Sequence, residues 1–227
     1  AELLDVQYDM LEKKEFPVVI LISGVDGSGK GETINLLYSW MDPRHISTLA
    51  FSAPSDEETS RPYMWRYWRA LPPKGKVGIF AGSWYSQPIT DRINGHLRRS
   101  DLDGRLEDIN RFEKLLARND VVLLKFFLHI SRKEQRERLL ARLEDPERNW
   151  KITPEDLEER KYWGDYVRAY EEAIERCSTG HAPWYIIPAN HKWFRDLAVS
   201  QILVETLEGL KPKFPAPKFD LSKVRVV

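Results

Sequence analysis

The stretch VVILISGVDGSGKGETINLL, Val18 to Leu37, decides the fold because it joins three patterns in a row. Residues 18–23 form a continuous apolar run rich in β-branched side chains, as in a strand buried on both faces. Residues 24–31, GVDGSGKG, fit the GxxxxGK pattern of a phosphate-binding loop. A helical pattern with apolar residues on one face follows. In this context glycines let successive backbone N–H groups turn toward phosphate oxygens.

The loop therefore predicts a phosphate site. The helix after it offers the positive end of its dipole to the anion, and Lys30 adds a point charge. The candidate phosphate-binding residues are Gly24, Gly27, Ser28, Gly29, Lys30, Gly31, Glu32 and Thr33. The alternative is a glycine-rich turn that binds nothing, which the strand–loop–helix context disfavours.

Two residues depart from the common form of this loop. Gly31 stands where a Mg²⁺-binding Ser or Thr is usual, and Thr33 comes two residues later. Asp26 places a negative charge among groups that face phosphate. Asp26 is either a turn former, a common role for this residue type, or a side chain that reaches a magnesium ion or orients the attacking phosphate.

The remainder of the chain alternates strands with helices. Further strands are expected at residues 46–52, 77–80, 121–130 and 184–187. Helices are expected at 2–14, after the loop as far as 42, at 62–71, from about 88 and 106, after Ser131, at about 154–177 and at 192–210. This order predicts an α/β fold with a parallel, doubly wound sheet and right-handed crossovers. His129, inside one of the apolar runs, is expected to be a core residue.

Composition limits the classes of function. The 227 residues carry 35 basic and 35 acidic side chains, so attraction for a polyanion must come from local clustering. The neutral balance and the absence of a recognition motif argue against nucleic-acid binding, and no apolar run reaches the length of a membrane span. A single cysteine, Cys177, and a first segment unlike a signal peptide lead us to expect a cytoplasmic protein.

Two charged segments have a functional and a structural interpretation each. PYMWRYWRAL, residues 62–71, places Arg66 and Arg69 beside Trp65, either for base stacking and phosphate contacts or as a partly buried aromatic face with solvated arginines. RKEQRERLLARLEDPERNWK, residues 132–151, is on composition a solvated surface helix with a polar continuation. It could also fold down onto a polyanion as a lid.

Several long stretches resemble the family-2 polyphosphate kinases. They are GVDGSGKGETINLL, AFSAPSDEETSRPYMWRYWRALPPKGKVGIFAGSWYS, LLKFFLHISRKEQRERLLARLEDPERNWKITPEDLEER and APWYIIPANHKWFRDLAV. The resemblance runs from about Leu3 to Leu210, keeps the order of motifs and is strongest to the class of polyphosphate:AMP phosphotransferases. It implies a P-loop kinase fold, three-layer α/β/α with a mainly parallel sheet and a helical lid. It also implies Mg²⁺-dependent transfer of a phosphoryl group between inorganic polyphosphate and a nucleotide.

The resemblance also implies roles for particular residues. Asp26 and Lys30 take the catalytic positions, with Asp26 serving the metal. The lid, about residues 131–160, contributes Arg138, Arg142, Arg148 and Lys151. In this frame Arg61, Arg66 and Arg69 are where an acceptor nucleotide, AMP by preference, is held.

The second motif, VGIFAGSWYS at residues 77–86, differs from the FDRSWYNR-like form of active family members. Ala81, Gly82 and Gln87 stand where that form has an aspartate and two arginines. The GSWYS form resembles the first of two fused kinase-like domains, so the chain is either a working phosphotransferase or a non-catalytic half that binds polyphosphate or supports a partner domain. An ATP-dependent nucleoside-monophosphate kinase is a weaker third alternative.

The expected organisation is one kinase-like domain at residues 1–210 and an extended tail or linker at 211–227. The tail, KPKFPAPKFDLSKVRVV, is rich in proline and lysine, as linkers often are. We expect a homo-oligomer or fusion to a second kinase-like domain.

Overall fold

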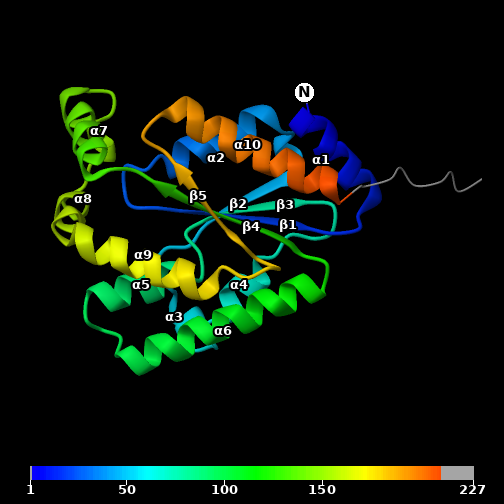
Figure 1. The fold of residues 1–227 in the computed structure, drawn as a ribbon, viewed down its shortest axis with the longest axis horizontal. Helices are drawn as coiled ribbons and strands as arrows, with labels where there is room; N and C mark the ends of the chain where they lie inside the picture. The colour runs from blue at the N-terminus through cyan, green and yellow to red at the C-terminus, as the bar shows by residue number, and fades with distance from the viewer. Residues whose placement is uncertain (1, 211–227) are drawn as a thin grey trace, which may run out of the picture.

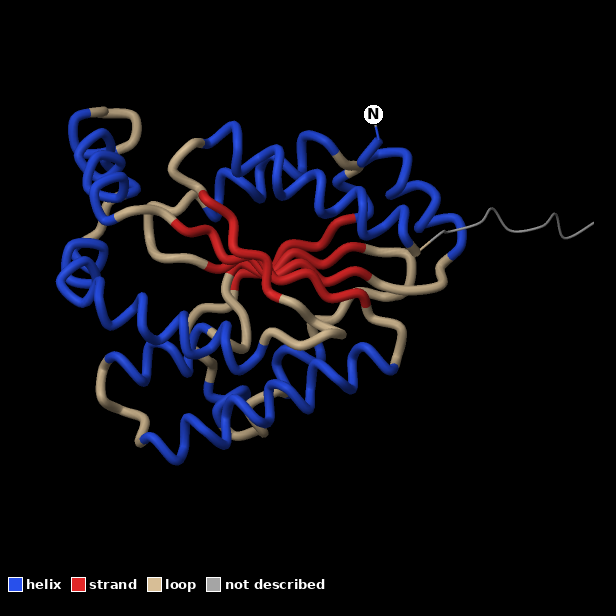
Figure 2. Tube along the Cα trace, in the orientation of Figure 1, coloured by secondary structure: helices blue, strands red, loops and turns tan. Residues whose placement is uncertain are grey.

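The computed structural model describes residues 2–210, which build a five-stranded sheet between two layers of helices (Figures 1 and 2). The strands are β1 (Val18–Ser23), β2 (Ile46–Ala50), β3 (Val77–Ala81), β4 (Val122–His129) and β5 (Trp184–Pro188). They are all parallel and lie in the order β2-β3-β1-β4-β5, so β1 has a neighbour on each side. The expected parallel α/β architecture is confirmed.

The alternation of side chains along β1 divides the core in two. Val18, Ile20 and Ile22 join one apolar cluster, whereas Val19 and Leu21 point into the other. All six residues of β1 are buried, which explains why this strand is apolar throughout and does not alternate with polar residues.

Each cluster is covered by its own helices. The helices over one face are α1 (Glu2–Lys13), α2 (Lys30–Trp40) and α10 (Lys192–Gly209). Those on the opposite face are α4 (Trp65–Arg69), α5 (Ser86–Ile93), α6 (Arg99–Arg118) and α9 (Trp163–Cys177), with α3 (Asp56–Thr59) in the same layer (Figure 1). A 3₁₀ turn, η1 (Pro43–His45), leads into β2.

A group of short helices projects beyond the end of the sheet where the strands finish (Figure 1). It comprises α7 (Arg132–Glu144), η2 (Asn149–Lys151), α8 (Pro154–Glu159) and η3 (Arg160–Tyr162), and occupies the residues expected for a lid. Ser131 caps α7 by accepting a hydrogen bond from the backbone N–H of Glu134. Thr153 and Asp156 form a capping box at the start of α8.

Several details of the sequence predictions were wrong. The expected helix at 62–71 is helical only over Trp65–Arg69, and the acidic segment before it contains α3. The helix expected over 154–177 is interrupted by η3, and the one expected from about 106 already begins at Arg99. His129 is exposed, because it is the last residue of β4 and lies at the open end of the sheet.

A buried polar network fixes the segment after β3. Lys125 of β4 donates to Glu113 of α6 (2.6 Å), to the Tyr85 hydroxyl (3.0 Å) and to the backbone oxygen of Cys177 (2.7 Å). Trp84 and Tyr85 both donate to the same Glu113 carboxylate. The network therefore joins the β3–α5 connection to three other elements.

Within residues 2–210, every helix is too short or too polar to cross a membrane. The predicted tail at 211–227 lies outside the described residues.

Candidate phosphate site

The phosphate-binding loop connects the end of β1 to the start of α2. Gly24, Gly27 and Gly29 all have positive φ angles, of 146°, 77° and 101°. A Cβ atom on Gly24 would lie 2.7 Å from the backbone oxygen of Leu128, so this position requires glycine. The loop thus turns sharply between β1 and the N-terminus of α2, where the helix dipole favours an anion.

Lys30 is the first residue of α2, and its ammonium group turns back toward the loop. Its Nζ donates to the backbone oxygens of Gly24 (2.8 Å) and Val25 (3.2 Å). Burial lowers the pKa of Lys30, while the charges of Asp26 and Glu159 act in the opposite direction. These carbonyl bonds are ones that Lys30 can exchange for phosphate oxygens.

Helix α7 contacts the loop through three side chains. Gln135 donates to the backbone oxygen of Asp26 (2.9 Å), and Arg138 Nη1 donates to that of Gly27 (2.9 Å). Arg142 forms an ion pair with Asp26, at 3.1 Å between Nη1 and Oδ2. The predicted lid and the predicted loop are therefore in direct contact.

Acidic side chains from α8 lie beside Asp26. Asp156 is within hydrogen-bonding reach of the Asp26 carboxylate, and Glu159 is close enough to act on Lys30. Burial raises the pKa of Asp156, and the charge and hydrogen bonding of Asp26 raise it further. The hydrogen bond that Asp156 accepts from the backbone N–H of Thr153 acts in the opposite direction. Such a pair of crowded carboxyl groups is where a cation would relieve the repulsion.

Residues of the loop, of α7 and of the segment after α7 surround a cavity of about 770 Å³. Its lining includes six cationic side chains, Lys30, Arg138, Arg142, Arg148, Lys151 and Lys192. Only Asp26 and Glu32 among the lining residues are acidic. The structure thus places the predicted loop acid, the loop lysine and all four predicted lid residues around one cavity.

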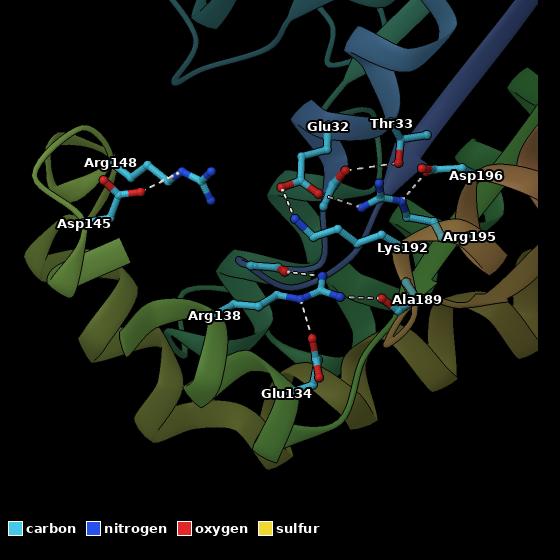
Figure 3. A network of polar contacts seen from close by, with 12 residues as sticks. Glu32, Thr33, Glu134, Arg138, Asp145, Arg148, Ala189, Lys192, Arg195 and Asp196 are labelled. Atoms are coloured by element: carbon cyan, nitrogen blue, oxygen red, sulfur yellow. Dashed lines mark hydrogen bonds and ion pairs between the residues drawn. The ribbon is translucent and has the colours of Figure 1, made fainter. Parts of the chain in front are cut away.

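Figure 3 shows how several of the basic groups are held. Arg138 lies between Glu134 and the backbone oxygen of Ala189, and Arg148 pairs with Asp145 (3.0 Å). Glu32 lies between Lys192 and Arg195. Although burial acts to raise the pKa of Glu32, its bonds from these two cations lower it below the usual range.

Thr33 does not take the place of the usual metal-binding residue in the described arrangement. Its hydroxyl donates to the backbone oxygen of Gly29 (3.1 Å), which closes the first turn of α2. Ser28, in contrast, is fully buried and its hydroxyl has no hydrogen-bond partner.

The three arginines predicted to hold a nucleotide do not line this cavity. Arg61 and Arg69 both lie over the ring of Trp65, at 4.5 and 4.6 Å from its centre, and both pair with Glu57. Arg66 pairs with Glu58 and donates to the backbone oxygen of Ser52. The arginines and Trp65 are together, but they face the acidic helix α3.

The second motif brings no charged group to the end of β3. Ala81 is adjacent to Ile22 of β1, one residue before that strand ends, and Gly82 follows with a φ of 82°. Trp84 and Tyr85 are buried below the sheet. The positions at which active family members carry an aspartate and an arginine thus have small side chains here, at the edge of the sheet where β1 leads into the phosphate loop.

Sequence reasoning missed several residues of the site. Asp156, Glu159, Lys192 and Arg195 have no motif of their own, and each reaches the loop from a distant segment. A general rule of parallel sheets could have pointed to Lys192 and Arg195 as site residues. They follow the carboxyl end of β5, and in a parallel sheet all such ends meet at the edge where ligands bind.

A glycine-rich loop at the strand ends of a parallel sheet, with basic helices over it, defines a P-loop kinase-like protein. The family model described as polyphosphate kinase 2 matches residues 1–215. The chain belongs to this family.

Two relatives named for their activities support the assignment. A polyphosphate:AMP phosphotransferase of Pseudomonas aeruginosa is 43% identical over 207 residues, which are 91% of this chain and 42% of the relative. An AMP/ADP-polyphosphate phosphotransferase of Meiothermus ruber is 41% identical over 91% of this chain and 78% of its own length. The chain thus spans less than half of the first relative and most of the second.

The fold has a close counterpart among solved structures. The crystal structure of polyphosphate kinase 2 from Arthrobacter aurescens superposes with a TM-score of 0.94 at 37% identity. The match covers 97% of this chain and 80% of that one.

Proposed function

We propose that this chain transfers a phosphoryl group between inorganic polyphosphate and a nucleotide, with AMP, converted to ADP, as the favoured acceptor. The observation that carries the proposal is the cavity in which Lys30, the loop and the four lid residues meet. In a chain without net charge, six cations around one cavity form a local attraction for a polyanion. The names of the relatives supply the substrates, polyphosphate with AMP or ADP.

Different residues of the cavity have different roles in the proposed phosphoryl transfer. An oxygen of the nucleotide phosphate attacks the terminal phosphorus of polyphosphate, the bridging P–O bond breaks, and polyphosphate leaves one unit shorter. Loop amides and Lys30 hold the transferred group, and lid arginines neutralise its charge and exclude water. Because this chemistry depends on positioning and charge neutralisation, it requires no covalent intermediate with the protein.

Asp26 and Asp156 fit a magnesium ion. Carboxylate oxygens are ligands that Mg²⁺ prefers, and the ion usually completes its shell with water and substrate phosphates. Within residues 2–210, no cluster of three or more His, Cys, Asp or Glu could hold a metal alone, so substrate oxygens would have to contribute. Bound there, the ion would supply positive charge to the phosphates.

Arg61, Arg66 and Arg69, with Trp65, are the group that we propose for the acceptor nucleotide. The ring of Trp65 offers a surface on which the base of the nucleotide can stack, and the arginines can donate hydrogen bonds to the phosphate of the nucleotide. Their ion pairs with Glu57 and Glu58 would have to exchange for the nucleotide.

The test is ADP formation by the purified chain with magnesium, polyphosphate and AMP. We expect Lys30→Ala to lower kcat by about 100-fold or more, as the loss of one preorganised charge at the reacting group does. Replacing polyphosphate by ATP as the donor separates the proposal from a nucleoside-monophosphate kinase. Binding of polyphosphate without any turnover would contradict catalysis and favour the non-catalytic half.

Location in the cytoplasm and assembly into a homo-oligomer, or fusion to a second kinase-like domain, stay predictions. The short coverage of the Pseudomonas relative leaves room in that protein for another domain. Size measurement of the purified chain in solution tests self-association directly.

A further inference from the structure

We propose that Lys192 is a polyphosphate-contacting residue and that Glu32 competes with the substrate for it. This inference rests on the proposed function, since it assigns two further residues to the same cavity. The roles of Lys192 and Glu32 do not follow from the loop pattern or from the predicted lid residues. It follows from how one carboxylate is shared between a fixed cation and a movable one.

Lys192 is the movable partner. It is the first residue of α10, it lines the cavity, and its side chain is 54% exposed. Its Nζ bonds Glu32 Oε1 at 3.0 Å. An exposed pair of this kind is worth little, about 1 kcal/mol or less, so an arriving phosphate can replace it.

Arg195 is the fixed partner. Its side chain is only 2% exposed, and it donates to Glu32 Oε2 (3.0 Å) and to Asp196 Oδ1 (2.8 Å). It is also packed directly against the loop, because a Cβ atom added to Gly29 would lie 1.9 Å from its Nη1. Figure 3 shows Glu32 between these two cations.

This asymmetry makes the exchange inexpensive. When Lys192 turns to a phosphate, Glu32 keeps its bond to Arg195, so no carboxylate is left unpaired. The same carboxylate lies in the first turn of α2, beside the loop, where it repels the bound polyanion. Glu32 thus weakens polyphosphate binding in two ways, by repulsion and by holding Lys192.

The two residues therefore have opposite predicted effects, which a purely structural role would not produce. Lys192→Ala should raise the Kd for polyphosphate by about three- to tenfold. Glu32→Gln should lower that Kd by a similar factor, because the amide can still accept the bond from Arg195. In the double variant the gain from Glu32→Gln should shrink, since the released lysine is absent.

The measurement is calorimetric titration with linear polyphosphate of defined length, together with a melting curve for each variant. Matched controls lie away from the site. Lys74→Ala removes an equally exposed lysine (53%), paired with Asp120 at the opposite end of the sheet. Glu107→Gln removes an exposed carboxylate of α6.

Each outcome decides between the hypotheses. A Lys192→Ala variant within about twofold of the wild type, or weaker binding by Glu32→Gln, would overturn the inference while leaving the proposed function intact. Strictly additive effects in the double variant would leave only general repulsion and also overturn the competition. A wild-type chain that does not bind polyphosphate would instead overturn the proposed function itself.

Discussion

At the scale of single residues, Gly29 shows how tightly the phosphate loop is constrained. Its φ of 101° is unfavourable for any residue with a Cβ, and Arg195 fills the space that this atom would need. We expect Gly29→Ala to lower the free energy of unfolding by about 2 kcal/mol or more and to weaken polyphosphate binding. Urea unfolding and calorimetric titration measure the two effects.

Gly31, two residues later, provides the matched control. It is inside α2 and an added Cβ would meet nothing within 4 Å. Gly31→Ala should therefore stabilise the chain by about 0.5–1 kcal/mol, as alanine does in a helix. Equal destabilisation by both substitutions would show that the loop tolerates no side chain at all, whatever its backbone angles.

At the scale of elements, Asp42 attaches α1 to the segment before β2. Its carboxylate accepts bonds from Arg44 and from Tyr8 of α1 (2.8 Å), and these bonds lower the pKa of Asp42. A carboxyl group with a lowered pKa in the folded state stabilises that state above its unfolded pKa of about 4. This contribution is lost as the pH falls through the folded value.

Asp42→Asn should therefore be less stable than the wild type at pH 7, and the difference should shrink as the pH falls below about 4. Urea unfolding at a series of pH values provides the comparison. Asp108→Asn, which changes an exposed carboxylate of α6, should show little difference at any pH. A difference for Asp42→Asn that does not vary with pH would point to packing and not to charge.

The buried pair Lys125 and Glu113 joins four elements, and its two members should be strongly coupled. Lys125→Met leaves a buried carboxylate without its cation and should cost about 3–5 kcal/mol of unfolding free energy. Adding Glu113→Gln should restore part of that loss, because glutamine is neutral and still accepts from Trp84 and Tyr85. If the second substitution made the loss larger, the carboxylate would not be the source of the cost.

Some secondary-structure elements could be predicted from the sequence and others could not. The strand β1, the phosphate loop and the start of α2, all within residues 18–37, are specified by neighbouring residues, so local patterns identified them. The break at Arg160–Tyr162 and the short α4 depend on packing against other elements, which periodicity does not report. The same limit applies to Arg195 beneath Gly29 and to Asp156 beside Asp26, pairs that only the folded chain brings together.

At the scale of the whole molecule, equal numbers of acidic and basic residues leave no general attraction for a polyanion. The cavity is different, with six cations against two carboxylates in its lining. Binding of polyphosphate should then release counterions from a few defined contacts and depend steeply on salt. With about 0.7 units per contact, as for single-stranded nucleic acids, four to six contacts predict a slope of about −3 to −4 in a plot of log binding constant against log salt.

Variants locate the source of that slope. Removing one lid cation, as in Arg142→Ala or Lys151→Ala, should make the slope shallower by about 0.7 units, whereas Arg111→Ala on the exposed surface of α6 should leave it unchanged. Titrations between 50 and 300 mM salt give the slopes, since screening is incomplete over this range. A wild-type slope near −1 would mean that the basic residues stay paired with carboxylates of the protein and do not contact the bound polyphosphate. In that case the loop and Lys30 alone would hold the substrate, and the helices over the cavity would serve another purpose.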